Sequence, residues 1–231
     1  MDIYYEVHGT GKPIILLHGN QENRTIFKDL IHDLKPSYRL IAMDSRYHGK
    51  SMKSGELSLH QMALDVMSIA DGLGLDEYDV IGFSDGANIG LTLAGMDERL
   101  KHLIAMSPNA SPKGLKLPFR LSMYLTLFCL LPFCIYNKRA RIKWKLTRFM
   151  MKEPHFNEEY LHNIKIPVLL LSGEYDLIKE EDLEFIAESL PHCFHKVIAQ
   201  STHNLLISEY DQTLTEIRGF LYAVSNTHSD N

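Results

Sequence analysis

The chain has 231 residues, a formal net charge of −5, and 45% hydrophobic and 23% charged residues. This length suits one large domain with a substantial core and is short for two full domains, and the composition is that of an ordinary soluble globular protein. The acidic balance gives no sign of nucleic-acid binding. We expect neither a disulfide framework nor a metal site, because the three cysteines and twelve histidines show no zinc-like spacing.

The chain begins with patterns that indicate buried strands. Residues 1–7 alternate like a strand and show no signal-peptide pattern, which makes the cytoplasm the default location. Residues 14–17 are apolar at successive positions, which is typical of a strand buried on both faces of a parallel sheet. This run ends in the sequence HGN at 18–20, where glycine allows a sharp turn and leaves amides free to face a ligand. A helix is expected over residues 21–35.

The alternation of strands and helices continues to residue 106. We expect a strand at 39–43, a helix opened by a capping box at 58–61 that runs to about residue 72, and strands at 78–83 and 101–106. This rhythm predicts a mostly parallel sheet with helices on both faces. Ligands bind such sheets at the carboxyl ends of the strands.

Residues 82–86, GFSDG, fit the pattern G-x-S-x-G between an apolar strand and a helix that runs to about residue 95. A serine held on a strained strand-to-helix turn needs flanking residues with almost no side chain. The helix that follows would aim its first backbone N–H groups and the positive end of its dipole at the serine oxygen. Taken alone, the pentapeptide also fits an ordinary strand-to-helix turn.

Residues 108–165 break this rhythm. The run 121–136 is strongly apolar, but it is too short to span a membrane and contains Pro132. We expect a helical cap laid across the carboxyl edge of the sheet with its apolar side facing the site. The basic stretch 138–152 is interpreted as a solvated helix face, with an anionic-lipid or anionic-substrate patch as the alternative.

The strand and helix pattern then resumes to the end of the chain. We expect a strand at 166–173, a helix at about 179–190, a strand at 194–199, a helix at about 205–223 and a frayed tail at 225–231. The chain is therefore expected to form one domain over 1–231, with 108–165 as a helical cap insertion.

Five motifs in this order resemble the α/β-hydrolase family over residues 13–222. HGN at 18–20 is similar to its oxyanion loop, DSRYHGKS at 44–51 to its D-x-R-G-x-G-x-S loop, and GFSDG at 82–86 to its nucleophile elbow. GEYD at 173–176 and STHN at 201–204 are similar to its acid and histidine loops. The order serine, aspartate, histidine is the one expected for this fold. The resemblance implies an α/β fold with a serine hydrolase site and no cofactor.

The expected catalytic residues are Ser84, Asp176 and His203. A serine hydroxyl is a poor nucleophile at neutral pH and needs a base within hydrogen-bond reach, and His203 could accept that proton and return it to the leaving group. Asp176 would orient His203 and stabilise the imidazolium; the other interpretation of Asp176 is a carboxylate at a helix N-terminus. His18 is the rival histidine, but the resemblance implies a structural role for it.

Two other acids are candidates for the role of Asp176. Glu174 lies two residues earlier in the same motif, and Asp44 belongs to a loop that the family does not use for this acid. Tyr47 in the same loop replaces the usual glycine, which puts the geometry of that loop in question.

The resemblance implies that the backbone N–H groups of Asn20 and Asp85 stabilise the tetrahedral oxyanion. Asp85 departs from the Gln, Met or His that is more usual after the serine. Its carboxylate either favours the start of the helix or biases the site toward a substrate with a cationic group.

We therefore expect a hydrolase that cleaves a small to medium, apolar carboxylic ester through an acyl-enzyme intermediate. A thioesterase, amidase, lactonase, lipase or carbon–carbon bond hydrolase would use the same triad, and a ligand-binding signalling protein could be built on the same fold. A haloalkane dehalogenase is disfavoured because Ser84 stands where that class has an aspartate. The expected partner is a small-molecule ester, with membrane contact and a homodimer left open.

Overall fold

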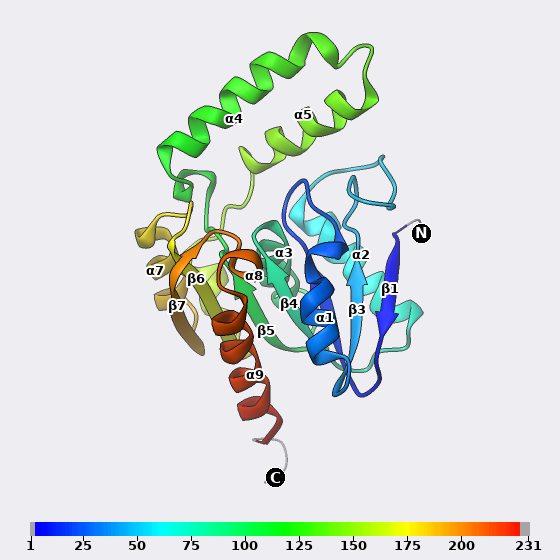
Figure 1. Ribbon diagram of the computed structural model, residues 1–231, viewed down its shortest axis with the longest axis vertical. Coiled ribbons are helices and arrows are strands. Elements are labelled where there is room, and N and C mark those ends of the chain that lie inside the picture. Colours follow the sequence, from blue (N-terminus) through cyan, green and yellow to red (C-terminus); the bar gives the residue numbers. More distant parts are fainter. Residues whose placement is uncertain (1–2, 227–231) are drawn as a thin grey trace.

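A seven-stranded sheet runs through the middle of the molecule (Figure 1). The computed structural model describes residues 3–226. Its strands are β1 (Tyr5–His8), β2 (Lys12–Leu17), β3 (Tyr38–Met43), β4 (Tyr78–Phe83), β5 (Leu100–Met106), β6 (Val168–Tyr175) and β7 (Cys193–Thr202). The strand order is β1-β3-β2-β4-β5-β6-β7, with β1 antiparallel to β3 and the other neighbours parallel.

Helices cover both faces of this sheet. One face carries α1 (Lys28–Leu34), α8 (Leu205–Ser208) and α9 (Tyr210–Asn226), and the other carries α2 (Leu59–Gly72), α3 (Asp85–Ala94) and α7 (Glu180–Ser189). The predicted α/β class, with a mostly parallel sheet between two helical layers, is confirmed.

The continuous apolar run in β2 is explained by these two layers. Ile15 and Leu17 belong to the core cluster shared with α2 and α3, whereas Ile14 and Leu16 belong to the cluster shared with α1 and α9. All four side chains are fully buried. Successive side chains of a strand point to opposite faces, so a strand between two helical layers must be apolar at every position.

Helix boundaries follow local capping. The Ser58 side chain accepts a 3.2 Å hydrogen bond from the backbone N–H of Gln61, which starts α2 as predicted. The helix expected at 21–35 begins instead with a 3₁₀ turn, Arg24–Phe27, capped by the Asn23 side chain.

The helix predicted at about 205–223 is divided in the structure and ends later than expected. It is divided into α8 and α9 at Glu209, whose φ of −144° and ψ of 63° are not helical. At its carboxyl end α9 continues through Ser225 and Asn226, which were expected in a frayed tail. The remainder of that predicted tail, 227–231, lies outside the described residues.

Above the carboxyl ends of the parallel strands stands a helical hairpin, here called the cap hairpin (residues 117–150; Figure 1). It consists of α4 (Leu117–Leu130), a 3₁₀ turn (Leu131–Phe133) and α5 (Lys138–Met150), and α6 (Glu158–His162) follows it. The assignment of 108–165 as an insertion into one domain stays a prediction. None of the helices within residues 3–226 has the length and apolar character needed to cross a membrane.

The expectation that the apolar side of the cap faces the site is wrong for α4. Of the residues of α4, only Met123 is buried, and large apolar side chains such as Leu125 and Phe128 are 63% and 78% exposed. The reason is that only the base of the hairpin, at Phe119 and Met150, reaches the pocket at the sheet edge.

Candidate active site

Ser84 lies at the turn between β4 and α3. Its φ of 53° and ψ of −118° fall outside the regions that non-glycine residues ordinarily adopt. A Cβ at Gly82 would lie 2.3 Å from the backbone oxygen of Gly86, and one at Gly86 would lie 1.9 Å from that of Leu17. The two glycines of G-x-S-x-G are therefore needed because backbone segments approach each other too closely for any side chain.

His203 lies between Ser84 and Asp176. The Ser84 hydroxyl donates a 3.0 Å hydrogen bond to His203 Nε2, and His203 Nδ1 donates a 2.6 Å hydrogen bond to Asp176 Oδ1. A carboxylate can only accept a hydrogen bond, so Nδ1 of the neutral ring must carry the proton. Nε2 therefore keeps a lone pair that can take the proton of the serine hydroxyl. The three side chains follow β4, β6 and β7 and meet at the carboxyl edge of the sheet.

Asp176 is held as a carboxylate by its neighbours. It is 3% exposed, and besides His203 it accepts hydrogen bonds from the Ser107 hydroxyl at 2.6 Å and from the backbone N–H of Ile178 at 3.0 Å. Burial opposes its charge, but these hydrogen bonds and the charge of His203 outweigh burial and hold the pKa of Asp176 below its ordinary value.

Ser107 was missed by the sequence analysis. It directly follows β5 and has a φ of 52°, and its hydroxyl bonds to the Asp176 oxygen that does not contact His203. Its position at the carboxyl end of a buried strand is the same signal that identified the other site residues.

The backbone N–H groups of Asn20 and Asp85 are candidates for an oxyanion hole. Neither donates a hydrogen bond to another of the described residues. The Asp85 N–H is the first of α3, where helix N–H groups have no partner within the helix. Their role as an oxyanion hole stays a prediction.

The Asp85 side chain is bound to Asn20. The Asn20 amide donates a 2.8 Å hydrogen bond to Asp85 Oδ2, and Asp85 as a whole is 8% exposed. Burial raises the pKa of Asp85 to about 6, against the opposing effects of the Asn20 hydrogen bond and the charge of His203.

A cavity of about 650 Å³ opens at Ser84 and His203. Its acidic lining residues are Glu22, Asp85 and Glu153, and no lysine or arginine among residues 3–226 lines it. The apolar part of the lining consists of Phe83, Leu115, Phe119, Met150, Tyr175 and Leu177.

Glu22 and Glu153 were not singled out in the sequence. Glu22 accepts hydrogen bonds from the backbone N–H of Gly19 at 3.2 Å and from the Asn204 amide at 3.3 Å, and burial raises its pKa. Glu153 accepts from the backbone N–H of Leu59. Neither lies in a motif, so only the three-dimensional structure reveals that both border the cavity.

The model of the alpha/beta hydrolase fold family matches residues 12–128, a segment that contains β2 to β5, Ser84 and most of α4. This chain belongs to the alpha/beta hydrolase fold family.

Individual relatives match this chain over different lengths. A putative carbamate hydrolase RutD from Azorhizobium caulinodans is 31% identical over 115 residues, which is 49% of this chain and 43% of that protein. The match therefore spans less than half the length of that relative. A pimeloyl-[acyl-carrier protein] methyl ester esterase from Aliivibrio salmonicida is 24% identical over 257 aligned positions, which cover 95% of both chains.

The solved structures show the same fold. That of the putative non-heme bromoperoxidase BpoC from Mycobacterium tuberculosis matches with a TM-score of 0.82 and 17% identity, covering 97% of each chain. At this identity the likeness concerns the fold alone.

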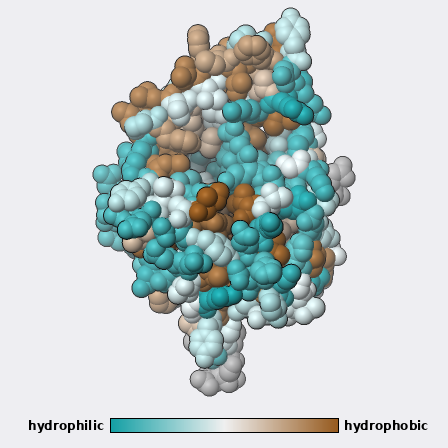
Figure 2. All heavy atoms as spheres, viewed as in Figure 1, coloured by the Kyte–Doolittle hydropathy of each residue, from teal (hydrophilic) through white to brown (hydrophobic). Residues whose placement is uncertain are grey.

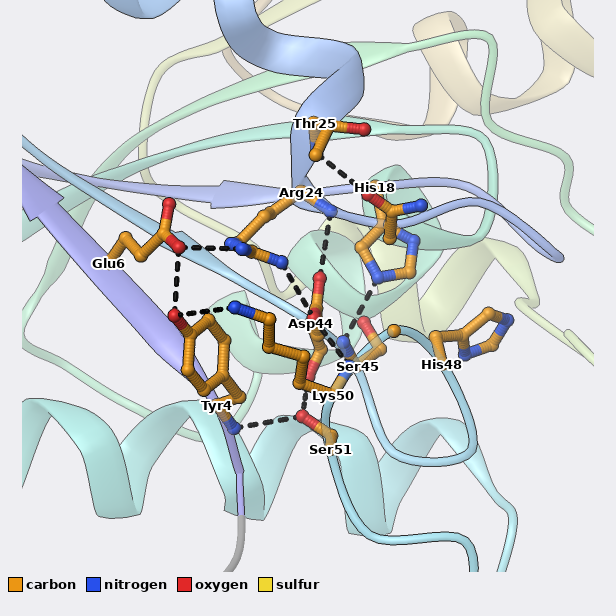
Figure 3. A network of polar contacts seen from close by, with 12 residues as sticks. Tyr4, Glu6, His18, Arg24, Thr25, Asp44, Ser45, His48, Lys50 and Ser51 are labelled. Carbon is orange, nitrogen blue, oxygen red and sulfur yellow. Dashed lines mark hydrogen bonds and ion pairs between the residues drawn. The ribbon is translucent and has the colours of Figure 1, made fainter.

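His18, the alternative candidate for the base, lies outside the Ser84 hydrogen-bond chain. It is 1% exposed, its Nε2 accepts a 3.0 Å hydrogen bond from the backbone N–H of Ser45, and its Nδ1 donates to the backbone oxygen of Gly19. Burial lowers the pKa of His18 to about 4, so the ring is neutral at pH 7. These contacts join the HGN loop to the loop after β3 (Figure 3).

The rival acids are also bound elsewhere. Asp44 is fully buried and accepts hydrogen bonds from the backbone and guanidinium of Arg24 and from the backbone N–H of Lys50 (Figure 3). Glu174 is exposed and accepts from the backbone N–H of Gln200. Neither contacts His203 in the described structure.

Tyr47 adopts a glycine-like conformation in the loop after β3. Its φ is 66°, its side chain is 4% exposed, and its hydroxyl donates a 2.7 Å hydrogen bond to the backbone oxygen of Gly55. The loop is further held by Arg46, whose guanidinium donates two 2.6 Å hydrogen bonds to the buried Asp65 carboxylate. Packing and hydrogen bonding thus stabilise a conformation that the side chain of Tyr47 disfavours.

Within residues 3–226, no cluster of three His, Cys, Asp or Glu side chains is placed to hold a metal ion.

Proposed function

We propose that this protein is a serine hydrolase that cleaves a carboxylic ester of a small to medium, uncharged apolar substrate through an acyl-enzyme intermediate. The observation that carries the proposal is the continuous hydrogen-bonded chain from the Ser84 hydroxyl through His203 to Asp176, with distances of 3.0 and 2.6 Å. Such a chain is the geometric requirement for nucleophilic catalysis by serine.

In the acylation step, Ser84 Oγ attacks the ester carbonyl carbon while its proton passes to His203 Nε2. The imidazolium that forms lies against Asp176, whose lowered pKa keeps it negative. Collapse of the tetrahedral intermediate breaks the bond to the alcohol oxygen, which receives the proton from His203. The acyl group is left esterified to Ser84.

Deacylation repeats this sequence with water. His203 Nε2 takes a proton from a water molecule that attacks the acyl carbon, and then returns it to Ser84 Oγ as the carboxylic acid leaves. In both steps the carbonyl oxygen becomes negative beside the N–H groups of Asn20 and Asp85, where one donor is worth about 2.7 to 4 kcal/mol of barrier stabilisation.

The cavity supports a substrate of this size and polarity. Its volume of about 650 Å³ lies within the range of roughly 300 to 1,000 Å³ typical of small-molecule sites. Its acidic residues, Glu22, Asp85 and Glu153, disfavour a substrate that carries a free carboxylate of its own. An uncharged ester, or one with a cationic group, meets no such repulsion.

The ester class draws support from the pimeloyl-[acyl-carrier protein] methyl ester esterase, which matches over 95% of both chains. A series of p-nitrophenyl esters of increasing acyl length tests the proposal, with the Ser84→Ala variant as the blank. Turnover that depends on Ser84 supports it. Absence of turnover at every chain length, together with tight binding of an ester, would instead favour a ligand-binding protein.

A further inference from the structure

The cap hairpin carries an apolar surface that no described residue covers. Seventeen large apolar side chains are exposed in the described part of the chain, and nine of them lie in this hairpin, between residues 117 and 136. They are Leu117, Leu121, Tyr124, Leu125, Phe128, Leu131, Phe133, Ile135 and Tyr136. Figure 2 shows this concentration as a brown region over α4 at the top of the molecule.

These side chains form one continuous surface. Residues 117, 121, 124, 125 and 128 are related by spacings of three, four and seven positions, so they lie on one face of α4, and Leu131 follows them in the 3₁₀ turn. The surface continues around the tip, where Ile135 and Tyr136 are 74% and 91% exposed. An apolar face of this extent on an otherwise ordinary surface marks an interaction site.

The second helix of the hairpin supplies a uniform charge. Residues 117–150 contain seven lysines and arginines and no aspartate or glutamate, which leaves 17 basic against 29 acidic residues in the rest of the chain. The six basic side chains of α5 are exposed and take part in no ion pair within residues 3–226. They are Lys138, Arg139, Arg141, Lys143, Lys145 and Arg148.

We propose that the cap hairpin docks on an anionic lipid surface, with the apolar face of α4 and the tip inserted at the level of the headgroups and the cations of α5 against lipid phosphates. An apolar face bordered by lysine and arginine is the composition of an interfacial element, and each cation near an anionic leaflet adds to the attraction. Tyr124, Tyr136 and Trp144 are of the aromatic types that favour the membrane interface.

Charge also favours lipid over a second copy of this chain. A symmetric dimer through α4 would bring two hairpins together, each with seven cations and no acidic side chain, and like charges at an interface are unfavourable. The acidic remainder of the chain would be repelled by the same lipid surface that attracts the hairpin, which orients the molecule with the hairpin toward the membrane.

This docking would place the base of the hairpin near the lipid. Phe119, near the start of α4, and Met150, at the end of α5, form the base of the hairpin and line the cavity that contains Ser84. The docking itself requires none of the groups proposed for ester hydrolysis, so the two proposals are tested separately.

Trp144 offers a direct test because it is the single tryptophan of the chain and lies on α5. Its fluorescence is followed while vesicles of phosphatidylcholine, or of phosphatidylcholine with phosphatidylglycerol, are added to the full-length protein. We expect a blue shift, and quenching by brominated lipid, with the anionic vesicles only, and a loss of both at high salt. The Ser84→Ala variant should bind like the wild type, whatever its activity.

Vesicle flotation of matched variants tests the residues. Lys143→Glu with Lys145→Glu should weaken binding by about tenfold or more, and Phe128→Ser with Ile135→Ser should weaken it at unchanged net charge. Lys28→Glu with Lys35→Glu, an equal charge change on exposed residues at and after α1, should have a much smaller effect than the cap lysine pair. All four sites of the cap variants are exposed, and circular dichroism checks that each variant folds.

Failure of wild-type protein to float with anionic vesicles at low salt would overturn the proposal. If the protein binds no vesicles but forms a dimer in solution, and Phe128→Ser converts that dimer to a monomer, the surface would instead belong to a contact with a second copy of this chain. Vesicle binding weakened as much by the α1 control as by the cap variants would also contradict it.

Discussion

The side chains of Asn20 and Asp85 are joined by a hydrogen bond of 2.8 Å, from the amide Nδ2 of one to the carboxylate Oδ2 of the other. The backbone N–H groups of the same two residues are the candidates for the oxyanion hole. The contact therefore ties the HGN loop after β2 to the start of α3, and both residues line the cavity. It holds two donors from separate segments in a fixed relation before any substrate binds.

The first prediction concerns the pH dependence of stability. The pKa of Asp85 is raised from 3.8 to about 6 in the folded protein. A carboxyl with a raised folded pKa costs stability once it ionises, so the cost is absent below about pH 4 and complete above about pH 6. Asp85→Asn, which can still accept from Asn20, should stabilise the protein by about 2 to 3 kcal/mol at pH 7.5.

Urea unfolding of the wild type and of Asp85→Asn between pH 4 and pH 8 measures this difference. The gain should shrink as the pH falls through 6 and approach zero near pH 4. Asp29→Asn, at an exposed carboxylate of α1, serves as control. A gain that is constant over this range would contradict the assignment of the charge to Asp85.

Ser107 should act as a positioning residue for Asp176. Removing its 2.6 Å hydrogen bond leaves the buried carboxylate with one donor fewer, and Ser107→Ala should lower kcat by about three- to tenfold with little change in KM. Ser172→Ala removes a buried hydroxyl that bonds to His195 instead and should leave kcat nearly unchanged. Equal effects of the two substitutions would indicate a merely structural role for Ser107.

The buried ion pair between Arg46 and Asp65 should be important for folding. Both side chains are nearly inaccessible, at 5% and 1%. Asp65→Asn leaves the guanidinium without its counter-charge and should cost about 3 to 5 kcal/mol in urea unfolding. Asp71→Asn breaks an ion pair of 2.7 Å with Arg99 at a site that is 67% exposed, and should cost at most about 1 kcal/mol. Similar losses for both variants would show that burial of the pair is not decisive.

Substrate charge should affect kcat/KM through the acidic lining of the cavity. We expect p-nitrophenyl butyrate to be cleaved at least about tenfold faster, in kcat/KM, than the p-nitrophenyl hemiester of glutaric acid, which carries a carboxylate. Glu153→Gln should narrow the ratio, whereas Glu158→Gln, at an exposed position outside the cavity, should not. Preference for the hemiester would refute the proposed substrate class.

The fold was largely predictable because its signals are local. Residues 14–17 of β2 and 80–83 of β4 are apolar at successive positions, and the Ser58 cap and the glycines around Ser84 each reflect one short segment. The order of the motifs then places polar loops at one sheet edge.

What the sequence could not provide depends on contacts between distant segments. Glu153 enters the cavity only because the cap hairpin returns to the sheet edge, and Ser107 becomes relevant only through Asp176, 69 residues later. The orientation of α4 was also beyond reach, since an apolar helix pattern does not show whether its face meets the site or the solvent.

The central claim is that Ser84 is the nucleophile and that His203 activates it. A fluorophosphonate probe, followed by mass spectrometry of the labelled peptides, tests this most directly. We predict one adduct per chain on Ser84 in the wild type, none in Ser84→Ala, and labelling at least about a hundredfold slower in His203→Ala, since general-base assistance contributes about 10²- to 10⁴-fold. Labelling that survives in Ser84→Ala, or an adduct on another residue, would contradict the account.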